Sequence, residues 1–215
     1  GAEAPHPLRV WLHGQTGSFL GKQVFRHVGD PNEWVISIDD WLPNVDFCTH
    51  YYGYHDGYDI HSDLNPVPVS GILHDYTAAR VAHTIEWAAR NLPVDSTRVY
   101  LTGMSMGAYG SIFAALTFPE KIAAIFIFGP EFDLAKWDDL LATRLWGTSQ
   151  GNLLTNSGQR RNERLNAGFL AGANRLVSIP VLYTFCGKND VNVGWSEKIP
   201  FYDSLRAARH GARRH

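Results

Sequence analysis

Ser105 stands between two glycines, Gly103 and Gly107, at the end of an apolar run formed by residues 99–101. The run predicts a short buried strand, and the residues after it predict a helix that ends at Pro119, because its apolar positions recur at helical spacing: Ala108, Ile112 and Ala115. A serine on such a sharp strand-to-helix turn has a strained backbone and an outward hydroxyl, and the free N–H groups of the helix start face it. The glycines leave room for the strand and the helix to approach each other. The pattern G-x-S-x-G in this context predicts a nucleophile.

A serine hydroxyl becomes a good nucleophile only when a base takes its proton and an acid orients that base. Asp190 is the predicted acid, because it lies in the turn that follows the apolar run 181–185 and therefore at the same sheet edge as the serine. The alternative for Asp190 is a cap for a helix that begins near Ser196. Asp133 is a second candidate acid, but we expect it to be the N-cap of a helix that starts at Leu134.

The negative charge that develops on an attacked carbonyl needs two N–H donors. Met106 supplies the first at the start of the helix. The second is predicted in the turn after the first apolar run, where Gly14 lets the chain bend and Gln15 or Thr16 can present its amide. His13 is expected to brace this turn through hydrogen bonds.

The position of a catalytic histidine is not evident. Only His210 and His215 follow Asp190, although hydrolases with this motif place the histidine after the acid. Residues 196–209 predict a helix, and a helix of ~14 residues spans about 21 Å, which carries His210 away from Ser105. We therefore expect no histidine side chain within ~4 Å of the Ser105 hydroxyl. We also expect the chain, which begins Gly-Ala-Glu, to be a trimmed or partly recorded version of a longer protein.

Aromatic side chains crowd one long loop beside the expected site: Trp41, Tyr51, Tyr52, Tyr54 and Tyr58. Their flat apolar faces suit sugar rings or phenolic acyl groups, so they are predicted substrate contacts. An equal alternative is that they anchor the loop to the domain.

The same loop carries polar residues of the types that bind metals: His55, Asp56, Asp59, His61 and Asp63. Their spacing fits neither an EF-hand nor a zinc-binding helix, so we expect no metal and take them as solvated. A basic run further along the chain is expected to be a solvated face: Arg160, Arg161 and Arg164.

The elements that must position these residues alternate along the chain. Strands are predicted at residues 8–12, 34–38, 99–101, 123–128 and 181–185. Helical stripes lie between them, one formed by Val81, Ile85, Ala88 and Leu92 and another by Leu134, Trp137, Leu141 and Leu145. This alternation predicts an α/β fold with a mostly parallel sheet covered on both faces and a site at the carboxyl ends of the strands. Residues 1–215 are expected to form a single domain, with loop insertions at about 43–73 and 147–178 that serve as lids or binding loops.

Bulk composition excludes several classes of protein. The chain has 215 residues, 45% of them hydrophobic and 19% charged, as in a folded globular domain. Its net charge of −2 gives no basic footprint for nucleic acid, and no apolar run reaches the ~20 residues of a membrane span. The cysteines Cys48 and Cys186 are expected to be free thiols.

Several motifs together resemble the α/β-hydrolase superfamily: His13-Gly14 after a strand, the serine motif, and Gly-Lys-Asn-Asp190 after a late strand. The segment from Asp75 to the serine motif is similar to serine esterases of the polyhydroxybutyrate-depolymerase and feruloyl-esterase-like branch. The resemblance spans most of the chain. It implies a three-layer sandwich, truncated at both ends, that hydrolyses carboxylic esters through an acyl-enzyme without a metal or organic cofactor.

The substrate expected from this resemblance is a small-molecule or polymer-linked ester. A serine peptidase or lipase would use the same groups, because the fold does not determine the acyl substrate. A second alternative is a non-catalytic binding module for carbohydrate or polymer. The sequence leaves open the oligomeric state and whether the protein is secreted or cytoplasmic.

Overall fold

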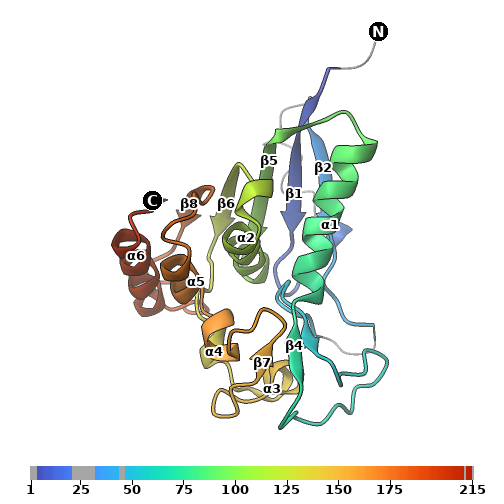
Figure 1. Ribbon diagram of the computed structural model, residues 1–215, viewed down its shortest axis with the longest axis vertical. Coiled ribbons are helices and arrows are strands. Elements are labelled where there is room, and N and C mark those ends of the chain that lie inside the picture. Colours follow the sequence, from blue (N-terminus) through green and yellow to red (C-terminus); the bar gives the residue numbers. More distant parts are fainter. Residues whose placement is uncertain (1–3, 21–31, 44–46, 211, 215) are drawn as a thin grey trace.

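A computed structural model describes residues 4–20, 32–43, 47–210 and 212–214. Six strands form a parallel sheet in the order β2-β1-β5-β6-β8-β9 (Figure 1). Their bounds are β1 His6–Leu12, β2 Trp34–Ile38, β5 Val94–Met104, β6 Ala124–Phe128, β8 Val181–Phe185 and β9 Ala212–Arg214. The five predicted strands are therefore confirmed, although β5 is longer than the apolar run that indicated it.

Four helices lie side by side along one face of this sheet (Figure 1), each in contact with the next. They are α1 Tyr76–Asn91, α2 Met106–Thr117, α5 Ala167–Ala173 and α6 Lys198–Ala207. The first predicted stripe is confirmed, because Val81, Ile85 and Ala88 are buried on α1. Helix α2 is buried along almost its whole length because neighbours surround it, and the short helix η2, Pro119–Lys121, follows it.

The opposite face of the sheet carries a row of aromatic side chains. Phe126 and Tyr183 are register partners on β6 and β8 and stack with ring centroids 4.9 Å apart. One step nearer the carboxyl edge, Phe128 and Phe185 stack at 4.8 Å and are partly exposed. Within the described ranges the helices named above pack on the other face, whereas the sequence predicts cover on both.

The two long connections contribute a second, small sheet at the carboxyl end of the main one (Figure 1). It consists of β3 Tyr54–His55, β4 Ile72–His74 and β7 Leu154–Thr155. We call residues 132–166 the cap; besides β7 it contains the short helices η3 Leu134–Lys136, α3 Leu140–Trp146 and α4 Arg161–Arg164. The prediction of one continuous helix from Leu134 to Leu145 is wrong, because the Asp139 carboxylate accepts from the N–H groups of Leu141 and Ala142 and starts a separate helix.

Arginines that the sequence predicts on a solvated face are instead buried in the cap. Arg161 is 0% exposed, and its guanidinium donates to the carbonyl oxygens of Ala135 and Trp137 at 2.7 and 2.6 Å. Arg164 pairs with Asp75 before α1, and its guanidinium lies 4.7 Å from the ring centroid of Phe113 on α2. The prediction is wrong for these two residues because the cap folds over them, and it holds for the exposed Arg160.

Candidate active site

Ser105 lies between the end of β5 and the start of α2, as the sequence predicts. Its φ of 52° and ψ of −116° are a strained combination for a residue with a side chain. The Ser105 N–H donates to Phe128 O at 2.8 Å, and its carbonyl accepts from Ala108 and Tyr109 in the first turn of α2. Because Ser105 directly follows β5, it lies at the carboxyl edge of the sheet, and it is half-buried there.

The two flanking glycines are required by close packing. A Cβ on Gly103 would lie 2.2 Å from the Gly107 carbonyl oxygen, and a Cβ on Gly107 would lie 2.0 Å from the carbonyl oxygen of Leu12. No side chain fits at either position without moving the backbone. The predicted close approach of the preceding strand and the helix is confirmed for Gly103, whereas Gly107 is required by the approach of α2 to the end of β1.

The turn expected to supply the second amide packs directly against Ser105. The Gly17 N–H donates to Gly14 O at 2.8 Å, which places Gln15 and Thr16 at the exposed tip of a tight turn. A Cβ added at Gly14 would lie 3.8 Å from the Cβ of Ser105. Met106, the first residue of α2, has an N–H that the helix itself leaves without an acceptor. The turn that carries Gln15 and Thr16 thus packs beside the serine through Gly14, and the role of these amides stays a prediction.

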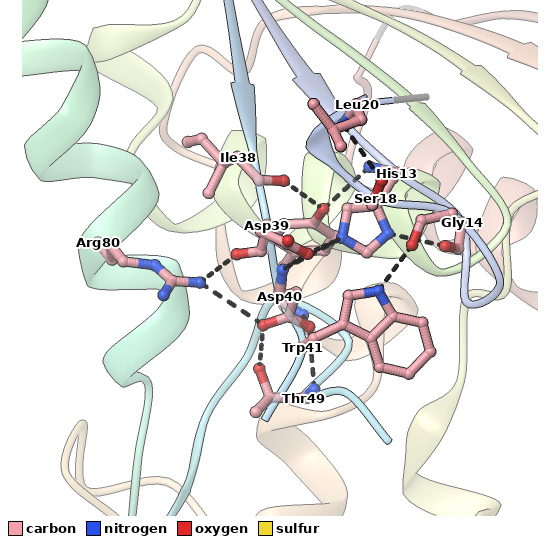
Figure 2. Close-up of polar contacts among 12 residues, drawn as sticks. His13, Gly14, Ser18, Leu20, Ile38, Asp39, Asp40, Trp41, Thr49 and Arg80 are labelled. Atoms are coloured by element: carbon pink, nitrogen blue, oxygen red, sulfur yellow. Dashed lines mark hydrogen bonds and ion pairs between the residues drawn. The ribbon is translucent and has the colours of Figure 1, made fainter. Parts of the chain in front are cut away.

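His13 lies beside Gly14 and braces this turn (Figure 2). Its Nδ1 lies 2.8 Å from Gly14 O, and its Nε2 lies 2.8 Å from Asp39 Oδ1. The neighbouring Trp41 indole donates to Gly17 O at 2.7 Å, so both ends of the turn are tied to the segment after β2. The predicted bracing role of His13 is confirmed.

Asp40 was not singled out by the sequence, yet it organises the segment after β2 (Figure 2). Its buried carboxylate accepts from the N–H groups of Thr49 and Tyr51, at 2.9 and 2.8 Å, and from the Thr49 hydroxyl at 2.7 Å. Burial raises the pKa of Asp40 to about 6, against the opposing effect of these hydrogen bonds and of Arg80. The sequence does contain a signal for Asp40: like Asp190, it comes just after a strand, here β2, at the carboxyl edge of the sheet.

Tyr51 and Tyr52 are 1% and 0% exposed, which leaves no ring surface for a ligand. The Tyr51 hydroxyl accepts from the His13 N–H and donates to Ile38 O, both at 2.9 Å. The anchoring interpretation therefore replaces the substrate-binding one for these two residues, since the loop folds them into the core.

Other members of the aromatic group remain accessible. Trp41 and Tyr54 line a cavity of about 290 Å³ beside the start of α1, together with Ile60, Tyr76 and Arg80. Tyr58 is half-buried and packs on Tyr54 with ring centroids 5.3 Å apart. These rings can contact a ligand.

Asp190 lies in the turn after β8, at the same edge of the sheet as Ser105. Its Oδ1 accepts from the N–H groups of Asn192 and Val193 at 2.9 and 3.2 Å, which hold its pKa below the usual value. Its Oδ2 lies 3.6 Å from the Cβ position of Gly129, which follows the carbonyl that binds the Ser105 N–H. The Asp190 carboxylate stabilises its own turn and does not cap a helix. Asp133 precedes η3 as expected, but its side chain pairs with Lys136 at 3.0 Å instead of capping.

His210, one of the two histidines after Asp190, is not brought to the serine. His210 follows α6, and its Nε2 lies 3.2 Å from Ala171 O on α5. It lines a cavity of about 670 Å³ with residues 175–179, which precede β8 and so lie at the opposite edge of the sheet from Ser105. His215 lies outside the described residues.

Within the described ranges, no group of three or more His, Cys, Asp or Glu residues is arranged to hold a metal ion. In the same part of the chain, no helix combines the length and apolar character needed to cross a membrane.

Residues 2–210 match the Esterase family, whose full description is "Putative esterase", and the chain belongs to this family. It is 24% identical to S-formylglutathione hydrolase of Mus musculus over 132 residues, which are 58% of this chain and 46% of that protein. The chain therefore spans less than half the length of that curated relative.

Two solved structures are similar over nearly all of the chain. S-formylglutathione hydrolase from Agrobacterium tumefaciens is 18% identical with a TM-score of 0.71, covering 99% of this chain and 76% of its own. FphF, a fluorophosphonate-binding serine hydrolase of Staphylococcus aureus, is 20% identical with a TM-score of 0.64, covering 100% of this chain and 76% of its own. The fold is that of the α/β-hydrolases. The polyhydroxybutyrate-depolymerase and feruloyl-esterase-like branch stays a prediction.

Proposed function

We propose that this protein is a serine hydrolase that cleaves carboxylic esters, with Ser105 as its nucleophile. The observation that carries the proposal is the strained backbone of Ser105 at the start of α2, held by two glycines that admit no side chain. A strained serine with an outward hydroxyl is costly for a protein that only binds. Membership of the Esterase family supports the same reaction.

In this mechanism the Ser105 oxygen attacks the ester carbonyl, and the alcohol leaves to give an acyl-enzyme that water then hydrolyses. The amides of Met106 and of Gln15 or Thr16 stabilise the oxyanion; the packing of the Gly14 turn against Ser105 supports this assignment. Asp190 orients the base that takes the serine proton. We assign the base to neither His13, which braces the Gly14–Gly17 turn, nor His210, which lies at the other sheet edge.

A small-molecule ester is the proposed substrate. Two of the relatives are named for hydrolysis of S-formylglutathione, a small acyl substrate. The accessible rings of Trp41, Tyr54 and Tyr58 offer flat apolar surface for its remaining groups.

Replacement of the nucleophile tests the proposal directly. Ser105→Ala is expected to lower turnover of a p-nitrophenyl ester by at least ~10³-fold, because triad members act as a unit. A fluorophosphonate probe is expected to label the wild-type protein at Ser105, with the labelled peptide identified by mass spectrometry.

Ser111→Ala is the matched control, since that hydroxyl lies two turns along the same helix and bonds only to Gly107 O. Its turnover and labelling should equal those of the wild type. Turnover that survives in Ser105→Ala, or a label on another serine, would exclude the assigned nucleophile. Absence of both turnover and labelling in the wild type would favour the non-catalytic binding module.

A further inference from the structure

Lys198, the first residue of α6, is buried although lysine is rarely buried without a specific partner. It is 1% exposed, and its Nζ donates to Pro130 O at 3.3 Å and to Val193 O and Gly194 O at 3.1 Å each. An ammonium group has three N–H donors, so three carbonyl oxygens satisfy it fully. A buried cation with this set of partners is a specific joint between chain segments.

The three carbonyls belong to the two loops that place the proposed acid. Pro130 lies in the loop after β6, directly after Gly129, which faces Asp190 Oδ2. Val193 and Gly194 end the Asp190 turn, and the Val193 N–H binds Asp190 Oδ1. Lys198 therefore holds both sides of the surface against which the Asp190 carboxylate rests.

Charged groups surround this joint. The carboxyl groups of Glu131 and Glu197 face and hydrogen bond to each other, and burial with this contact raises the pKa of Glu131 to about 8. The raised pKa keeps Glu131 largely protonated at neutral pH, beside the Lys198 ammonium. Lys136, paired with Asp133, faces both glutamates from η3.

We propose that Lys198 is a positioning residue, which fixes the Asp190 turn against the loop after β6 through its three carbonyl contacts. The inference rests on the proposed function, in which Asp190 orients the base. Without the ammonium, the Val193 and Gly194 carbonyls lose their bond to the Pro130 side, and the turn can move away from Ser105. A displacement of about 1 Å at such a group lowers turnover by roughly 10²-fold.

Lys198→Met keeps an unbranched side chain only one atom shorter and removes the donors. We expect kcat for the ester to fall ~10- to 100-fold with KM nearly unchanged, because substrate contacts are not touched. Hydrogen–deuterium exchange of the peptide covering residues 186–194 should become faster in this variant. Lys136→Met is the matched control, an exposed lysine of the same charge cluster, and should change neither quantity.

A double-mutant cycle with Asp190→Asn separates positioning from a general loss of stability. If Lys198 acts through Asp190, the double variant should be no slower than Asp190→Asn alone, whereas an independent role would make the losses multiply. Multiplied losses, or unchanged exchange of residues 186–194 in an active Lys198→Met, would overturn the inference. Faster exchange in a protein without Ser105-dependent turnover would reject the proposed function but not the joint.

Glu131→Gln provides the second variant in case Lys198→Met does not fold. In the wild type, loss of the Glu131 proton above pH 8 adds a negative charge beside Lys198, which draws the ammonium off its carbonyls. Exchange of residues 186–194, corrected for the intrinsic rate, should therefore rise above pH 8 in the wild type and stay flat in Glu131→Gln. Equal pH profiles for the two proteins would contradict the proposal.

Discussion

At the scale of single residues, the site divides into positions with a local cause and positions with a distant one. Ser105 and its two glycines form a local pattern, so the sequence predicts both their conformation and the reason for it. Lys198 and Asp40 look like ordinary charged residues in the sequence. Their burial follows from loops that meet only in the folded chain, and no local pattern records that meeting.

His50 belongs to the second group. It is 2% exposed, lies among the rings of Phe47, Trp137 and Trp146, and has a φ of 52°. Burial lowers its pKa from 6.5 to about 4, against a smaller opposing effect of Asp139. The folded protein therefore takes up this proton less readily than the unfolded chain does.

The free energy of unfolding should accordingly fall as the pH drops from about 6.5 to 4, by up to about 3 kcal/mol from His50 alone. The raised pKa of Asp40 has the opposite effect, because the stabilisation that its protonated form gives to the folded state is lost as the pH rises from about 4 to 6. His50→Asn removes the titrating group, tolerates the positive φ and leaves Asp40 in place. Urea unfolding between pH 4 and 7 should give this variant a shallower acid decline, and identical slopes would refute the assignment.

At the scale of elements, the strands and the helices next to the sheet follow from apolar runs and stripes. The cap does not, because its two-residue strand β7 pairs with β4, about 80 residues earlier in the chain: Ile72 with Leu154 and Leu73 with Thr155. Asp139 shows the same limit: one capping carboxylate divides a stripe that otherwise predicts a single helix.

The buried Arg161 is the main polar joint of the cap. Arg161→Met should lower the free energy of unfolding by roughly 3 kcal/mol, because the Ala135 and Trp137 carbonyls lose a charged donor while remaining buried. For a chain of this size the melting temperature should fall by roughly 6 to 12 °C.

The adjacent Arg160→Met offers a control, since that side chain is exposed. It should melt within about 2 °C of the wild type, as surface changes usually do. Equal melting temperatures for the two variants would show that the buried guanidinium does not hold the cap.

At the scale of the whole molecule, the order of strands and helices predicts the α/β class. In a parallel sheet the site is expected at the carboxyl ends of the strands. The chemistry that we propose at that edge follows from the sequence, because Ser105 and Asp190 each come directly after a strand. The sequence predicts cover on both faces of the sheet, whereas the four described helices named above pack on one face, because the side of a sheet on which a helix packs depends on how distant parts of the fold meet.

The two cysteines differ in their access to solvent. Cys48 lies in the core at 0% exposure, and burial raises the pKa of its thiol to about 12. Cys186 is half-buried beside the Asp190 turn, with its Sγ 3.5 Å from the Tyr202 hydroxyl. The thiolate is the reactive form, so the two should differ greatly in rate.

Because of this difference, the reaction of the buried Cys48 thiol can be used to measure the stability of the fold. A disulfide reagent such as DTNB should modify one thiol of the native protein, at Cys186, and two after denaturation. In Cys186→Ser the remaining slow reaction measures how often the core opens to expose Cys48. When the core closes faster than the exposed thiol reacts, the rate of this reaction gives the free energy of unfolding without added denaturant. Rapid reaction of Cys48 in the native protein would mean that the core around it opens locally.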